Sequence, residues 1–177
     1  MATLTKEQTD AAGEFANATI AALKIGEGVH PPTIIAASAR MAGTYLFRSF
    51  DLELPGLKPG QVVLSEAANE QSAQLIQITA GILSRIGTKI ADSPPDAAAG
   101  SRHKPVLEFL DTQKKLEPAY APIKARFSLT DRQAAEAVAV GTALLIRHAK
   151  DFLDPNIAFG IAVYGYIEGA KTAPEPI

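Results

Sequence analysis

The chain has 177 residues, with 17 basic and 19 acidic side chains, a net charge of −2 and no cysteine. That length fits one domain, and the near balance of charge gives no electrostatic attraction to nucleic acid or to an anionic membrane surface. The absence of cysteine excludes disulfides, thiolate nucleophiles, cysteine-ligated zinc and iron–sulfur clusters. Aromatic residues make up only 6% of the chain, and the frequent alanines favour closely packed helices.

The start of the chain, residues 1–8, has neither the basic residues nor the apolar core of a secretion signal. The longest stretches without charge, residues 71–84 and 155–167, are shorter than the ~20 residues that a membrane-spanning helix needs. We therefore expect a cytoplasmic protein with neither a membrane nor a nucleic acid as partner.

The first predicted helix covers residues 5–24. Thr5 is followed three positions later by Gln8, and this spacing is a capping box at a helix start. Glycines at positions 26 and 28 end the helix.

The second predicted helix covers residues 31–50 and begins with two prolines, which are tolerated in a first turn because no amide partner is needed there. Its only charged residues are Arg40 and Arg48, which share one stripe with Thr44. So few charges predict that this helix lies at the centre of the fold.

A third helix is predicted over residues 65–86, with Ser65 as its N-cap. The preceding residues 61–64 could form one extended piece, but a single strand has no partner with which to pair. Residues 88–104 contain prolines, small residues and few large apolar ones, which predicts a flexible surface loop.

A fourth helix is predicted from Pro105, with a break or kink near Pro118 and Pro122 because proline removes an interior helix hydrogen bond. A second capping box, Thr130 with Gln133, opens a fifth helix that reaches about residue 152.

A sixth helix is predicted over residues 155–170, followed by a frayed tail at 172–177. The helix has no charge from Pro155 to Ile167, so all its sides are apolar and either the protein or a second subunit must cover them. Small residues recur at i, i+4, i+7 and i+11 and predict a seam for a closely packed neighbour: Ala158, Ala162, Gly165 and Gly169.

These elements predict an all-α fold, a bundle of about six helices without a significant β-sheet, in a single domain over residues 1–177. The buried pair is expected to be the helices at 31–50 and 155–170, with those at 65–86 and 130–152 packed against them. Because so much apolar helix is hard to cover in one chain of this size, we expect a homodimer.

The candidate site is a polar group between the second and third helices: Arg40, Arg48, Glu66, Asn69 and Glu70. If these helices pack antiparallel, Arg48 lies near Glu66 and Glu70. Arginines there could bind a carboxylate or a phosphate, and the glutamates a metal. A plain salt bridge that complements the helix dipoles explains the same residues.

Two tyrosines of the sixth helix, Tyr164 and Tyr166, are added as candidate ligand-binding residues, because a buried phenol hydroxyl needs a hydrogen-bonding partner. No histidine follows a glutamate at the spacing of di-iron bundles, and no nucleophile motif is present. We therefore assign no catalytic residue, no metal and no cofactor.

Three functions remain, in this order. The first is a non-catalytic interaction or scaffold protein that associates with itself. The second is a protein that binds a small anionic molecule between the second and third helices. The third is an enzyme that uses the same carboxylates, with or without a metal.

Overall fold

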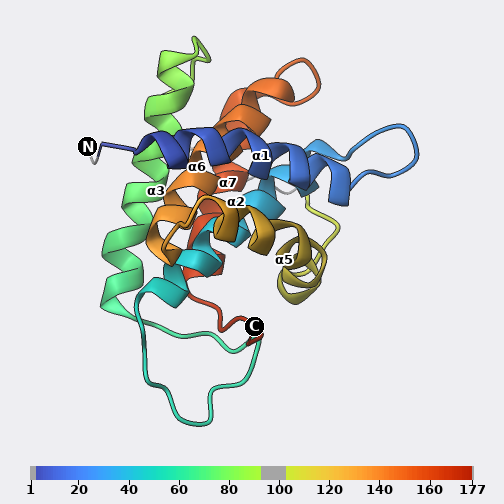
Figure 1. The fold of residues 1–177 in the computed structure, drawn as a ribbon. Helices are drawn as coiled ribbons and strands as arrows, with labels where there is room; N and C mark the ends of the chain where they lie inside the picture. The colour runs from blue at the N-terminus through green and yellow to red at the C-terminus, as the bar shows by residue number, and fades with distance from the viewer. Residues whose placement is uncertain (1–2, 93–102, 177) are drawn as a thin grey trace.

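The computed structural model describes residues 3–92 and 103–176 of the chain. Six helices form this part, without a strand or sheet, and the prediction of an all-α bundle is confirmed (Figure 1). Their bounds are α1 (Lys6–Ala22), α2 (Pro31–Ser49), α3 (Glu66–Arg85), α5 (Phe109–Arg126), α6 (Asp131–His148) and α7 (Pro155–Ala170).

Both predicted capping boxes are present. The hydroxyl of Thr5 accepts a hydrogen bond from the backbone N–H of Gln8, whose side chain accepts one from the N–H of Thr5. Thr130 and Gln133 do the same at the start of α6. These bonds satisfy amides that have no partner inside the helix, so the helix starts follow directly from the local sequence.

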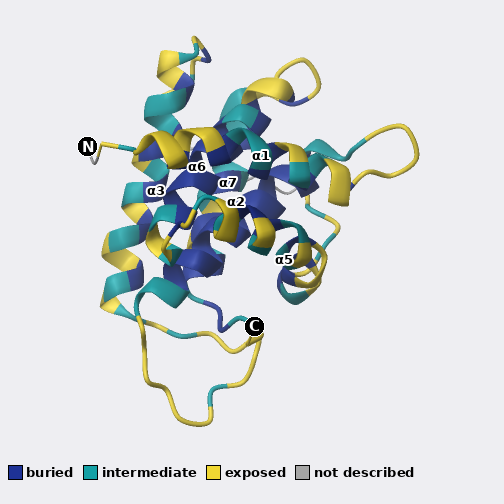
Figure 2. Ribbon diagram, viewed as in Figure 1, coloured by how far each residue is buried: buried dark blue, intermediate teal, exposed yellow. Residues whose placement is uncertain are grey.

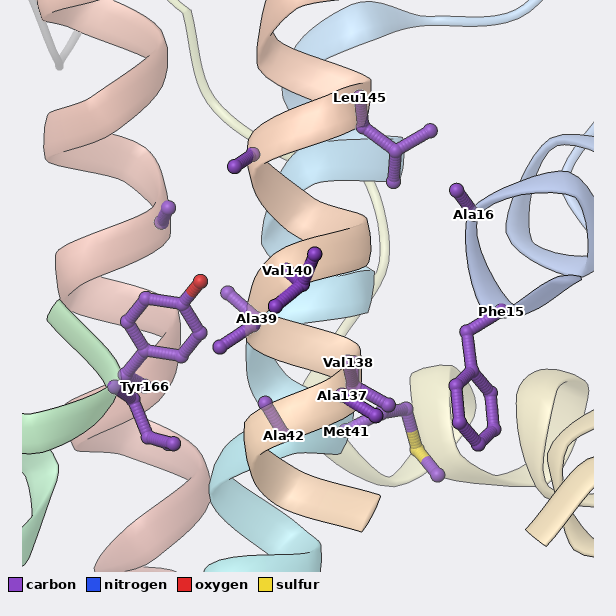
Figure 3. Close-up of a cluster of buried hydrophobic side chains, with 14 of the residues drawn as sticks. Phe15, Ala16, Ala39, Met41, Ala42, Ala137, Val138, Val140, Leu145 and Tyr166 are labelled. Atoms are coloured by element: carbon purple, nitrogen blue, oxygen red, sulfur yellow. The ribbon is translucent and has the colours of Figure 1, made fainter. Parts of the chain in front are cut away.

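The centre of the core is formed by α2 and α6. Every residue from Pro32 to Phe47 in α2 and from Ala134 to Ala143 in α6 is buried, and Figure 2 shows both helices enclosed by their neighbours. In Figure 3, side chains of these two helices lie between Tyr166 of α7 on one side and Phe15 of α1 on the other.

The prediction that α7 would be the second fully enclosed helix is therefore wrong, because α6 takes that place. Only one side of α7 is buried, and it carries the four predicted small residues, Ala158, Ala162, Gly165 and Gly169, together with Tyr166 and Ala170. Because the four seam residues have short side chains, the helix packs closely on α2 along this side, and its larger apolar residues other than Tyr166 stay partly buried or exposed.

Glycines bring the backbones of α2 and α7 into contact. A Cβ atom added at Gly169 would lie 2.3 Å from the carbonyl oxygen of Arg40, and one added at Gly43 would lie 2.7 Å from the Cα of Gly169. Real Cβ atoms do not come so close to other atoms, so both positions require glycine. The predicted small-residue seam of α7 is confirmed, and its partner is α2.

Helix α5 runs without interruption through Pro118 and Pro122. The two prolines are four residues apart and exposed, so they lie on one solvent-facing side of the helix. The carbonyl groups that lose their amide partners there can bond to water instead, which is why the predicted break is absent.

The tail after α7 differs from the prediction of a frayed end. It runs beside the extended residues 61–63: the N–H of Val63 donates to the carbonyl of Lys171 at 2.7 Å, and the N–H of Ala173 donates to the carbonyl of Gln61 at 2.9 Å. The extended piece that lacked a partner in the sequence thus pairs with the tail.

The flexible loop predicted over residues 88–104 falls largely on residues 93–102, which lie outside the described part. Within the described part, none of the helices has the length and apolar character to cross a membrane.

Candidate functional site

The predicted stripe on α2 exists, and we call Arg40, Thr44 and Arg48 the arginine stripe. Arg40 is buried, and its guanidinium donates to Glu168 of α7 at 2.6 Å and to the carbonyl of Leu107 at 2.5 Å. A longer bond of 3.3 Å reaches the hydroxyl of Thr112 on α5. Arg40 therefore joins three segments that lie far apart in the sequence.

Arg48, two turns further along α2, forms a bidentate ion pair with Glu117 of α5, with both N–O distances at 3.0 Å. It also reaches the carbonyl oxygen of Glu175 in the tail at 3.5 Å. Charged bonds of this fork-to-fork geometry are among the stronger ones in proteins. Each arginine thus has a carboxylate partner within the protein, and an external anion would have to displace it.

Two residues near the arginines keep unpaired polar atoms. The hydroxyls of Thr44 and Tyr45 are buried and have no hydrogen-bond partner among the described residues. Burial raises the pKa of Tyr45 strongly, Glu117 raises it further and Arg48 lowers it. The neutral phenol is thus retained well above the ordinary tyrosine range.

The structure does not bring the predicted polar group together. Glu66, Asn69 and Glu70 are exposed at the start of α3, and no described hydrogen bond or ion pair joins them to Arg40 or Arg48. The reason is the position of α3, which packs mainly against α6 and α7 and touches α2 little. The antiparallel contact on which the interpretation depended is minor.

The two candidate tyrosines have opposite environments. Tyr164 is 73% exposed, whereas Tyr166 is fully buried and its hydroxyl lies 2.6 Å from that of Thr79 on α3. The partner that a buried phenol needs is therefore a threonine of the same core. Tyr166 is not open to a ligand in this structure.

Tyr166 belongs to a group of six fully buried hydroxyls, one from each helix, which we call the hydroxyl chain. Three short hydrogen bonds join them in pairs, Thr19 with Tyr120 at 2.5 Å, Ser38 with Thr142 at 2.8 Å, and Thr79 with Tyr166 at 2.6 Å.

The three pairs are adjacent to one another. Burial raises the pKa of Tyr120 to about 12, while hydrogen bonding with Thr19 and then Ser38 lowers it. Burial likewise raises the pKa of Tyr166 to about 12, and hydrogen bonding with Thr79 and then Thr142 lowers it. The hydroxyls thus satisfy one another across the core, and this polar group is structural rather than open to a substrate.

A second buried polar cluster, which the sequence did not suggest, surrounds Glu136 of α6. Its two carboxylate oxygens accept bonds from the amides of Gln8 at 2.7 Å and Gln74 at 2.8 Å, and Arg132 lies 3.7 Å away. The cluster joins α1, α3 and α6. Because both oxygens are occupied, it too holds helices together rather than presenting a free acid.

Throughout the described residues there is no group of three or more histidine, aspartate or glutamate side chains that could hold a metal ion. The charged groups of the arrangements described above are paired with one another and join helices. Comparison of the chain with protein-family models found no match, and neither did searches of curated proteins and of solved structures.

Proposed function

We propose that the protein is a cytoplasmic, non-catalytic interaction module that associates with a second copy of itself through the outer face of α7. This face is formed by Ile157, Ile161, Tyr164 and Ile167. The observation that carries the proposal is their exposure in an uncharged helix: Tyr164 is 73% and Ile167 38% exposed, and Ile157 and Ile161 are half-buried.

The helical register places Ile157, Ile161 and Tyr164 on one stripe, next to the stripe of small residues that contacts α2, and Ile167 lies on the far side of Tyr164. The outer face has no charged residue before Glu168, and Glu168 is itself paired with Arg40. A surface helix of a monomer ordinarily carries polar residues on its outer side. An apolar outer side in this position is typical of a surface that a partner covers.

Exposed apolar side chains continue beyond both ends of α7. Phe152, 84% exposed, lies in the turn before the helix. Beyond its C-terminal end, Val62 and Leu64 are 65% and 83% exposed on the segment that pairs with Lys171. These residues are further apolar groups near the two ends of the helix that a partner could cover.

The second copy is the occupant that fits this surface. Under a twofold axis each outer face meets its own copy, and an uncharged stripe is then complementary to itself without like-charge repulsion. A helix of 16 residues is about 24 Å long and about 10 Å wide, so it covers on the order of 240 Å². Stable dimers bury about 800 Å² per partner. We therefore expect a weak, reversible dimer to which the flanking apolar residues contribute.

The experiment is sedimentation velocity over a concentration series from micromolar to millimolar. The unmodified chain should shift from monomer to dimer, and Tyr164→Lys should stay monomeric because it introduces like charges at the twofold contact. Ile25→Lys is the matched control, since Ile25 is 69% exposed in the turn after α1 and lies off the outer face. A monomer at every concentration, or equal dissociation by both variants, would contradict the proposal. The anion-binding and enzymatic alternatives have no comparable observation in their favour.

A further inference from the structure

The tail after α7 is hydrogen-bonded to residues 60–63 and to Gln113 of α5, which together we call the tail seat. We propose that the tail seat is a peptide-binding site, occupied here by the chain's own tail, which accepts an extended peptide with proline at alternate positions. This interaction is distinct from self-association through α7.

Along the tail, every second residue forms backbone hydrogen bonds with the tail seat. The carbonyls of Lys171, Ala173 and Glu175 all accept hydrogen bonds from the tail seat, and the N–H groups of Ala173 and Glu175 both donate to it. The residues between and after them are Pro174 and Pro176, which have no N–H. Each backbone donor from Ala173 to Pro176 is therefore used, and the outward positions have none to offer.

The tail seat reads the peptide backbone rather than its side chains. Gln113 donates to the carbonyl of Glu175 at 3.0 Å and accepts from its N–H at 2.9 Å, as a neighbouring strand would. The N–H of Gly60 adds a bond of 2.8 Å to the carbonyl of Ala173. The side chain of Glu175 is exposed. This is strand addition, a recurring mode of peptide recognition in which backbone bonds supply the affinity.

The end of the tail is suited to exchange. Thr172 and Ala173 are buried, but Glu175 and Pro176 are exposed, and Gln113 and Arg48 supply the hydrogen bonds to Glu175. Segments with few buried apolar contacts open at low free-energy cost. When the tail leaves, Arg48 keeps its ion pair with Glu117, whereas the amide of Gln113, which is 4% exposed with the tail in place, loses both its bonds to Glu175. A replacement peptide with the same backbone pattern restores both of these hydrogen bonds.

In the unmodified chain an added peptide must compete with the tail for the tail seat. The covalent link to α7 holds the tail there at an effective concentration in the millimolar range. A useful test therefore weakens the tail without removing it. Glu175→Pro deletes the N–H that donates to Gln113, while Glu175→Ala, the matched control, keeps that N–H and changes only the exposed side chain.

The test is fluorescence polarisation of a labelled peptide with the sequence of residues 170–177, titrated with full-length chains. Glu175→Pro should bind the peptide about tenfold more tightly than the unmodified chain, the effect of losing one backbone hydrogen bond in the competing tail. Glu175→Ala should bind like the unmodified chain. The double variant Gln113→Ala with Glu175→Pro should lose the tenfold increase in peptide affinity. A peptide with proline in place of its glutamate should bind poorly to every chain.

Equal peptide binding by Glu175→Pro and Glu175→Ala would overturn the proposal, and so would undiminished binding by the double variant. Thermal unfolding followed by circular dichroism shows that each chain is folded. Sedimentation of the same samples separates this result from the dimer proposal, because none of these changes touches the outer face of α7.

Discussion

The two sides of α7 have similar hydrophobicity, but one is buried and the other is exposed. The inner side, with Gly165 and Gly169, is pressed against the backbone of α2, whereas the outer side exposes Tyr164 and Ile167. Hydrophobicity alone does not separate them. The difference is size, because short side chains allow two backbones to approach and large ones hold them apart. In a helix that is apolar all round, the smallest residues mark the side that faces its own chain.

The largest effect on stability is expected from Gly169→Ala on the inner side. The new Cβ would lie 2.3 Å from the Arg40 carbonyl, so the backbones of α2 and α7 must separate. We expect a loss of about 3 kcal/mol in the free energy of unfolding, at the upper end of overpacking effects. Urea denaturation measures it.

Gly13→Ala is the matched control, because a Cβ at this position in α1 meets nothing within 4 Å. It should stabilise the protein by about 0.5–1 kcal/mol, since alanine loses less conformational entropy in a helix. Equal effects at the two glycines would show that close approach does not distinguish the inner side.

Alkaline pH should lower the stability of the fold, because buried tyrosines lie in the core against which the inner side of α7 packs. The pKa values of Tyr120 and Tyr166 are raised to about 12 by burial, against an ordinary value near 10 in the unfolded chain. Between pH 10 and 12 the unfolded state therefore releases protons that the native state retains, and the stability falls. The expected slope is up to about 1.4 kcal/mol per pH unit for each tyrosine.

Stability from this source is fully present below pH 10. Urea denaturation at pH 9, 10 and 11 checks the sign, and Tyr166→Phe should reduce the slope by one tyrosine's share. A free energy of unfolding that stays constant up to pH 11 would contradict the raised pKa values of the buried tyrosines.

The elements of this fold could be predicted from the sequence because they depend on local chemistry. Thr5 and Thr130 cap their helices from within three residues, and the small residues of α7 fall on one stripe by periodicity alone. The continuity of α5 could not be decided from the sequence, because a proline's effect depends on whether its side of the helix faces water, which a single segment does not reveal.

The site could be predicted only in half. Arg40 and Arg48 do share a stripe, but their partners are Glu168 and Glu117, which are 128 and 69 residues away. Choosing Glu66 assumed that helices adjacent in sequence are adjacent in space. A usable signal existed, since Glu168 is the lone charge in α7 and the contact between α2 and α7 was expected. Two buried helices with few charges must pair those charges with each other.

A smaller effect is expected when the phenol hydroxyl is removed on the inner side. Tyr166→Phe deletes the hydrogen bond with Thr79, whose hydroxyl still donates to the carbonyl of Leu75. Because no buried donor is left unpaired, we expect a cost of about 1 kcal/mol. Urea denaturation at neutral pH measures it. A cost near zero would show that the hydroxyl chain contributes nothing to the inner side's stability.

The smallest effect is expected on the outer side, from Tyr164→Phe. Tyr164 is 73% exposed and no described hydrogen bond involves its hydroxyl, so the change should alter the unfolding free energy by less than about 0.5 kcal/mol. The measurement must be made at low micromolar concentration, because a dimer would add a concentration-dependent term that belongs to the interface and not to the fold. Tyr164 and Tyr166 are two residues apart in one helix, so the same substitution at both compares the two sides with the chemistry held constant. If Tyr164→Phe cost as much as Tyr166→Phe in the monomer, the outer side would be packed within the chain, and the surface offered to a second copy would not exist.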